Sequence, residues 1–198
     1  STRDWSSDVC SSDLFLTAAA KLARLTGSQV PVGNMSYASW AEWDLQWMQQ
    51  GPMFIPQQQP VGGILVTDGL SMTDCSKINP TGSYWTYNQG VLLSGVSWIA
   101  LANGGDASLA AFARSIADAA IYKFNISGAF AETSCGADGN CDGQDGRMFK
   151  GVFVRHLNYA LPVLAQLSPD PDATLARHSA WILQQASTIL SKIGTAHV

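Results

Sequence analysis

The chain alternates between segments in which apolar side chains recur with a helical period and segments rich in glycine, proline and polar residues. Residues 15–27 are rich in alanine and leucine and end on Gly27, which is a helix-termination signal. A second helix is predicted over residues 37–50, where tryptophans recur at helical spacing on one face and Gly51-Pro52 stops the helix. Together the two segments predict a helical hairpin.

The same pattern of paired helices occurs twice more. The predicted pairs are 89–102 with 109–122 and 148–167 with 173–192, and Asp106 is the expected N-cap of the second helix in the first of these pairs. The first helix of each pair is apolar nearly all round, which predicts burial, while the second is more amphipathic and should lie outside.

Three helical hairpins in sequence are typical of an α-solenoid or of a closed (α/α) barrel. Long loops between the pairs favour the barrel, because such loops build a pocket at one mouth, whereas solenoid linkers are short. We therefore predict an all-α fold, a partial (α/α)6 toroid of about three hairpins and six helices. The weak alternation over residues 62–70 predicts a short β-hairpin arm before the second pair.

Composition narrows the class of protein. The chain has 198 residues, of which 46% are hydrophobic and 13% charged, enough apolar surface for one domain with a sizeable core. The net charge is -4 and no basic stripe occurs, which argues against nucleic acid as a partner. No apolar run reaches the roughly 18 residues of a membrane span.

The first 14 residues differ in character from the rest. The segment from Asp4 to Leu14 is polar and lacks a helical period, and it resembles one translated reading frame of a common sequencing-adapter oligonucleotide. We expect residues 1–14 to be a disordered artefact and residues 15–198 to be the domain. On this interpretation Cys10 is not a native cysteine, and the natural protein begins further upstream.

Three motifs carry a resemblance to a known family. They are Thr67-Asp68-Gly69 followed by Thr86-Tyr87-Asn88-Gln89-Gly90, the stretch Phe149-Lys150-Gly151-Val152-Phe153-Val154-Arg155, and the helix from Phe15 to Gly27. In this order they resemble glycoside hydrolase family 76, over essentially all of residues 15–192. The resemblance implies an (α/α)6 barrel that acts on α-1,6-linked mannan.

The resemblance also implies a retaining mechanism with two adjacent aspartates, one as nucleophile and one as acid/base, about 5 Å apart. The chain contains no Asp-Asp pair. In the family the pair precedes the segment that starts here, so we expect this chain to be an inactive fragment of a mannan endo-1,6-α-mannosidase and predict no catalytic residue in it.

Two alternatives stay open at this stage. The first is a cell-wall transglycosylase on the same scaffold, because donor and acceptor choice lies in loops that one sequence does not explain. The second is a non-catalytic helical-repeat protein that binds glycans. In each case the predicted partner is a polysaccharide, with no nucleic acid and no cofactor, and the full-length protein is expected to be a monomer.

Candidate substrate contacts come from the motif segments. Tyr87, Asn88 and Gln89 open an inner helix and are predicted to hydrogen-bond mannose hydroxyls; the alternative is a helix start with Asn88 as the capping residue. Asp68 is either an acceptor for a sugar hydroxyl or an ordinary turn aspartate.

Charged residues before and within the third inner helix are further candidates. Asp145 and Lys150 are predicted to contact substrate, and Asp142 less so; helix capping is the alternative for Asp145. The stretch 138–143 echoes the opening of a calcium loop, but Phe149 stands where the bidentate glutamate is required, so we predict no metal site.

Cysteines and glycosylation triplets indicate the compartment. Cys135 and Cys141 have neither the spacing of a redox motif nor a second pair for zinc, which favours a local disulfide and leaves Cys75 for a partner elsewhere. Asn34 and Asn125 lie in N-glycosylation triplets. We therefore expect a secreted or cell-wall protein.

The histidines carry no catalytic prediction. His156, on an inner helix, is expected to be satisfied within the core, and His178 and His197 are expected at the surface.

Overall fold

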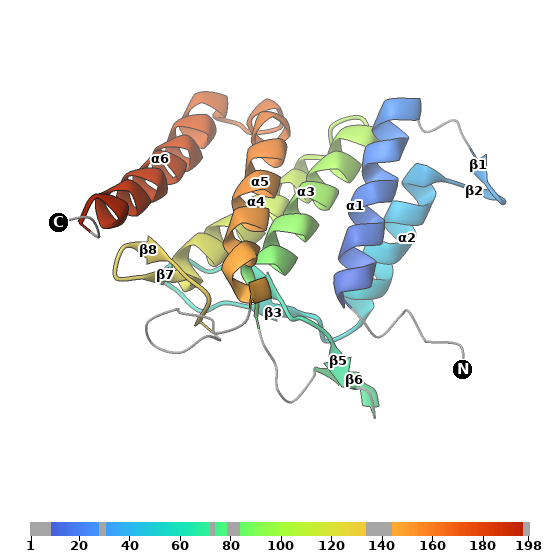
Figure 1. The fold of residues 1–198 in the computed structure, drawn as a ribbon. Coiled ribbons are helices and arrows are strands. Elements are labelled where there is room, and N and C mark those ends of the chain that lie inside the picture. The colour runs from blue at the N-terminus through green and yellow to red at the C-terminus, as the bar shows by residue number, and fades with distance from the viewer. Residues whose placement is uncertain (1–8, 28–30, 72–73, 79–83, 134–143, 196–198) are drawn as a thin grey trace.

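The computed structural model describes residues 9–27, 31–71, 74–78, 84–133 and 144–195, and this part of the chain is predominantly helical (Figure 1). The helices form three consecutive hairpins, as the periodicity predicts. Their bounds are α1 Val9–Thr26, α2 Tyr37–Gln50, α3 Thr86–Ala102, α4 Ala107–Lys123, α5 Gln144–Gln166 and α6 Pro171–Thr195. The fold is thus a partial toroid of α-helical hairpins.

The first helices of the three hairpins form the inner layer. Helix α3 packs against both α1 and α5, and all three begin at the end drawn lowest in Figure 1. Helices α2, α4 and α6 return in the opposite direction. Nearly all of α3 is buried, from Thr86 to Ala100, which confirms that an all-round apolar helix lies inside.

Two glycines set how closely the inner helices approach. A Cβ on Gly90 would lie 2.6 Å from the Cα of Phe153 on α5, and a Cβ on Gly95 would overlap Leu16 and Thr17 on α1. Thr17 also donates a hydrogen bond from Oγ1 to the carbonyl of Val91, at 2.8 Å. Helix α3 therefore touches its neighbours backbone to backbone on two sides.

Short antiparallel strand pairs occupy the connections. They are β1 Pro31–Val32 with β2 Met35–Ser36, β3 Phe54–Pro56 with β4 Ile64–Val66, β5 Leu70–Ser71 with β6 Asp74–Ile78, and β7 Asn125–Ile126 with β8 Ala129–Phe130. The predicted single hairpin over residues 62–70 is wrong in its pairing. That segment contributes β4 to one pair and the start of β5 to the next, because Thr67, Asp68 and Gly69 link two ribbons.

The first helix begins earlier than the sequence predicts. Helix α1 starts at Val9, and Asp13 is fully buried, so the described residues 9–14 are helical and the expectation that they are disordered is wrong. The physical reason is that residues 9–14 extend an existing helix by under two turns, and propagation costs far less than nucleation. The origin of residues 1–14 stays a prediction.

The tryptophan face of α2 is not its buried face. The buried side chains of this helix are Ala41, Asp44, Leu45 and Met48. Trp40 and Trp47 pack at the margin of the core, and Trp43 is 53% exposed. Asp106 caps α4 as predicted, accepting from the amides of Ser108 and Leu109. Ser36, for which no capping role was predicted, caps α2.

Both ends of the partial toroid expose apolar side chains. On α1 and α2 an apolar groove of about 440 Å³ is lined by Phe15, Ala18, Ala19, Leu22, Tyr37 and Trp40. On α6, at the other end in Figure 1, Leu183 and Leu190 are 69% and 68% exposed. Within the described ranges, no helix has the length and apolarity needed to cross a membrane.

The exposed apolar stripe of α6 should drive self-association of the 198-residue chain. Replacing Leu183 and Leu190 by lysine removes apolar surface that no part of the described chain covers. We expect sedimentation velocity to show several-fold less association, with a melting temperature changed by only a few degrees because exposed positions contribute little to folding.

The matched control adds the same charge without removing apolar surface, by replacing Gln184 and Ser187 with lysine on the same helix. If this control reduces association as much as the leucine variant does, repulsion and not the apolar stripe governs association.

Candidate functional site

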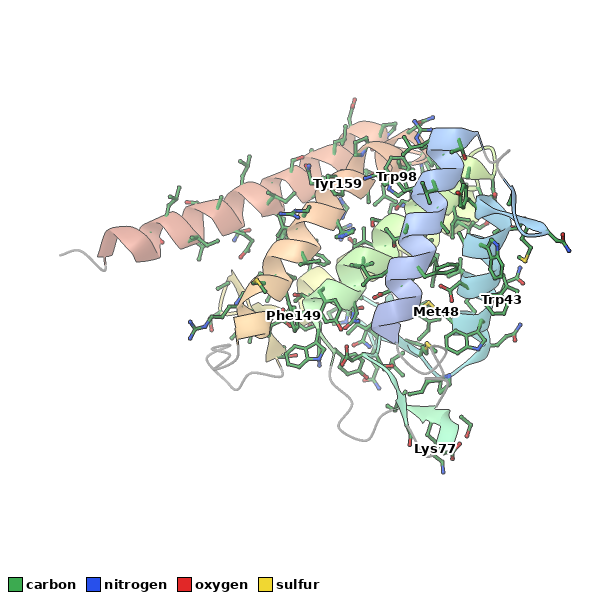
Figure 2. All side chains as sticks on the ribbon, turned by 45° about the vertical axis from the view of Figure 1, so that its right-hand side comes forward. Trp43, Met48, Lys77, Trp98, Phe149 and Tyr159 are labelled. Atoms are coloured by element: carbon green, nitrogen blue, oxygen red, sulfur yellow. The ribbon has the colours of Figure 1, made fainter. Side chains whose placement is uncertain are left out.

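Residues from two of the resemblance motifs, the one with Asp68 and Tyr87 and the one with Phe149, meet where α3 and α5 begin. The Tyr87 hydroxyl donates a hydrogen bond to Oδ1 of Asp68, at 2.7 Å. The Tyr87 ring lies 4.4 Å from the Phe149 ring, and the Phe149 ring lies 5.3 Å from the Trp85 ring. All four side chains are partly exposed. We call Asp68, Trp85, Tyr87 and Phe149 the mouth cluster; Figure 2 shows Phe149 at the start of α5, beside the loops.

Gln89 ties the strand that precedes Asp68 to helix α3. Its side-chain amide accepts from the backbone N–H of Val66 at 2.8 Å and donates to the Val66 carbonyl at 2.7 Å. It also donates to the carbonyl of Trp85 at 3.1 Å. Gln89 thus pairs with β4 as another strand would, and it is fully buried. In this structure its amide positions the segment that carries Asp68, and a sugar contact by Gln89 stays a prediction.

Asn88 lies inside α3, because the N-cap is Trp85. The alternative interpretation of Asn88 as the capping residue is therefore wrong. Its side chain is fully buried, and its Nδ2 donates to Oδ2 of Asp13 at 3.5 Å. Asp13 belongs to the segment whose adapter origin stays a prediction, and a sugar contact by Asn88 also stays a prediction.

Glu132 is a buried acid that the sequence interpretation missed. It follows β8, is fully buried, and accepts hydrogen bonds from the backbone N–H and the hydroxyl of Thr86. Burial raises the pKa of this carboxyl, while the Thr86 hydrogen bonds and the positive charge of Lys150 act in the opposite direction. No local pattern marks this residue, since its partner is 46 positions away in the chain.

The charged candidates near α5 are only partly described. Lys150 is half-buried and close enough to Glu132 to influence its pKa. Asp145 lies in the first turn of α5, but its side chain is outside what the structure describes. Asp142 and the disulfide candidates Cys135 and Cys141 also lie outside the described residues. For these, the sequence interpretation stays a prediction.

Two histidines behave differently from one another. Nδ1 of His156 lies 2.7 Å from the Ser94 hydroxyl, and burial together with the charges of Arg155 and Lys21 lowers the pKa of His156. His178 was expected at the surface, and this expectation is wrong, since only 2% of it is exposed. Its Nδ1 donates to the Thr174 carbonyl one turn earlier in α6, at 2.9 Å, and its Nε2 lies 3.4 Å from Oδ1 of Asp118 on α4. This face of α6 is therefore turned toward α4. His197 lies outside the described residues.

Asp44 is the second buried acid that sequence reasoning missed. It points from α2 toward α1 and is 4% exposed. Burial raises its pKa from 3.8 to about 7, and a hydrogen bond from the backbone of Leu16 opposes the shift only in part. It lies outside the mouth cluster, so its effect is on stability.

These observations first define a class: a segment of an α/α-hairpin toroid whose inner helices present an aromatic and acidic cluster at one mouth. The profile of one family, described as glycosyl hydrolase family 76, matches residues 4–192. The chain belongs to glycosyl hydrolase family 76.

Similar proteins carry related names. The chain is 31% identical over 176 residues to the mannan endo-1,6-alpha-mannosidase DCW1 of Saccharomyces cerevisiae, which covers 84% of this chain and 33% of that protein. It is 32% identical to DCW1 of Eremothecium gossypii, over 85% of this chain and 33% of that protein. The mannan endo-1,6-alpha-mannosidase DFG5 of Saccharomyces cerevisiae is 28% identical, with 82% and 32% covered. This chain spans about a third of these relatives, and no solved structure matches it.

Asp44 should make stability depend on pH. Its raised pKa means that the folded chain keeps the proton between about pH 4 and about pH 7 while the unfolded chain loses it. The stability that protonated Asp44 contributes to the folded chain is therefore fully present below pH 4. As the pH rises toward 7 this contribution to the free energy of unfolding is lost, by at most roughly 1.4 kcal/mol per pH unit.

Replacing Asp44 by asparagine should flatten this dependence and raise the free energy of unfolding at pH 7, measured by urea denaturation from pH 4 to pH 8. The control is Glu42→Gln on the same helix, at a position that is less buried. A wild-type chain whose stability rises between pH 4 and pH 7 as steeply as that of the Asp44 variant would contradict this assignment.

Proposed function

We propose that this chain forms one wall of the substrate cleft of an enzyme that cleaves α-1,6-mannosidic linkages in mannan. The observation that carries the proposal is the mouth cluster, in which two of the family motifs meet in one partly exposed group of rings and one carboxylate. Aromatic rings offer apolar faces for sugar rings, and carboxylate oxygens accept hydrogen bonds from hydroxyls. The names of the relatives supply the linkage and the sugar.

Within the proposal, each member of the cluster has a role. Asp68 is the acceptor for a mannose hydroxyl, and the Tyr87 hydroxyl orients its carboxylate through the 2.7 Å hydrogen bond. Trp85 and Phe149 are the rings on which a sugar face packs. Lys150, at the start of α5, is the cationic member of the proposed polar wall.

Catalysis itself is assigned to residues outside this chain. A retaining mechanism needs two carboxyl groups about 5 Å apart, one to attack the anomeric carbon and one to protonate the leaving oxygen. Because the sequence has no Asp-Asp pair, we place both groups in a segment that precedes residue 15 in the natural protein. The 198-residue chain should therefore bind mannan fragments without hydrolysing them.

Binding to an α-1,6-linked mannotetraose, measured by calorimetry and by tryptophan fluorescence, tests the proposal. Replacing Asp68 by asparagine removes a charged acceptor and should weaken binding about tenfold, since a hydrogen bond to a charged group contributes roughly 1.5–3 kcal/mol. The control is Asp74→Asn in β6, whose carboxylate pairs with Lys77 at 2.8 Å and not with the cluster.

Equal affinity of wild type and the Asp68 variant would contradict the role of the cluster. Hydrolysis of mannan by the purified chain would contradict the placement of the catalytic pair. Equal binding of a β-1,4-linked glucan oligosaccharide would favour a general glycan-binding protein over a mannan-specific wall.

We also propose that the natural protein is secreted or held at the cell wall, as expected for a polysaccharide substrate outside the cell. Asn34 and Asn125 support this, because both acceptor side chains are exposed, next to the turns of the β1–β2 and β7–β8 ribbons. Protein expressed in a secretory host should lose mass on treatment with a peptide N-glycosidase. Asn34→Gln together with Asn125→Gln should abolish the shift, and a secreted wild-type chain with no shift would contradict glycosylation.

A further inference from the structure

Helix α3 has no cap of its own. Its N-cap residue, Trp85, makes no side-chain capping hydrogen bond, whereas α2 and α4 are capped by the adjacent Ser36 and Asp106. The first amides of a helix need acceptors, and a carboxylate there also interacts favourably with the helix dipole. Glu132 supplies both from 46 residues further along the chain.

A cap from a distant residue ties two segments together, which a local cap does not do. Glu132 accepts from the backbone N–H of Thr86 at 3.1 Å and from the Thr86 hydroxyl with its other oxygen. Thr86 directly precedes Tyr87. One side chain therefore connects the loop after β8 to the start of α3.

The same carboxylate also relates α3 to α5. The charge of Lys150 acts on Glu132, and Lys150 directly follows Phe149. Tyr87 follows Thr86 in the sequence and Phe149 precedes Lys150, and the rings of Tyr87 and Phe149 lie 4.4 Å apart. Glu132 is thus bonded to the start of α3 and senses the charge of a residue at the start of α5.

Burial of this charge has a cost that an ordinary cap avoids. A carboxylate removed from water is destabilised unless hydrogen bonds and an opposite charge compensate, and the raised pKa shows that compensation is incomplete here. A serine or aspartate next to Thr86 would cap the helix at lower cost. What Glu132 provides in addition is a link between the loop after β8 and the start of α3.

We infer that Glu132 is a positioning residue, whose hydrogen bonds to Thr86 hold Tyr87 against Asp68 and Phe149 at the mouth of the fold. This inference rests on the proposed function for the meaning of the cluster as a sugar contact. The geometry of the cap is independent of any ligand, so the two can be tested separately.

The experiment compares Glu132→Gln and Glu132→Ala with the wild-type chain. Without ligand, amide hydrogen exchange at residues 86–89 should rise roughly 5- to 30-fold in the alanine variant, as expected for a lost cap, and less in the glutamine variant, which keeps one acceptor. In the wild type, the NMR shift of the Thr86 amide should titrate with a midpoint above 4.5, the usual pKa of glutamate. This titration should be absent in Glu132→Gln.

The matched control is Asp106→Ala, which removes a carboxylate cap from outer helix α4, where it accepts from Ser108 at 2.8 Å and Leu109 at 3.1 Å. It should increase exchange at the start of α4 and leave residues 86–89 and mannotetraose affinity unchanged. Glu132→Gln should weaken mannotetraose binding at least threefold.

The outcomes separate the two claims. If the wild type does not bind mannotetraose, the proposed function fails, and the exchange and titration data still decide whether Glu132 holds the start of α3. If exchange at residues 86–89 is the same in Glu132→Gln, Glu132→Ala and wild type, or if the Thr86 amide does not titrate, the positioning role is overturned. If Asp106→Ala weakens binding as much as Glu132→Gln does, the effect is general stability, which also overturns it.

Discussion

The backbone contact of α3 with both neighbouring inner helices is the constraint on which the rest of the structure depends. Gly90 and Gly95 leave no room for a side chain against Phe153 on one side and Thr17 on the other. A Cβ at Gly90 would require α5 to move outward, because it would lie 2.6 Å from the Cα of Phe153, closer than two non-bonded carbons can approach. Such a shift would separate Phe149 from Tyr87. The geometry of the mouth cluster therefore depends on the close packing of α3 against α5.

This constraint explains why a single short motif combines residues of different kinds. In the run from Thr86 to Gly90, Thr86 receives the cap from Glu132 and Gln89 holds β4. Gly90 allows the approach of α5, and only Tyr87 points to the exposed cluster. Most residues of this motif therefore hold neighbouring segments in place. They position Tyr87 and, through β4, Asp68.

The sequence predicts what depends on local period and local capping, and fails where a distant segment decides. Helix α2 has the predicted bounds, and Asp106 caps α4 as predicted, since both signals lie within a few residues. The buried state of His178 and the cap from Glu132 depend on contacts between segments far apart in the chain. In the candidate site, Asp68 and Tyr87 were predicted, while Glu132 was not, because no pattern of spacing marks an acid that caps another segment's helix.

The site contains buried residues that hold the backbone and partly exposed residues at the mouth, and replacing the two kinds has different consequences. Trp85, Phe149 and Asp68 are partly exposed and end in solvent, so their replacement alters the surface without breaking a buried hydrogen bond of α3. Gln89 and Glu132 are fully buried, and each holds backbone groups that would lose their partners, which costs more than a lost surface contact. Under the proposed function, variation in substrate is therefore compatible with change at the rings and at Asp68, whereas Gln89 and Glu132 hold the backbone that positions them.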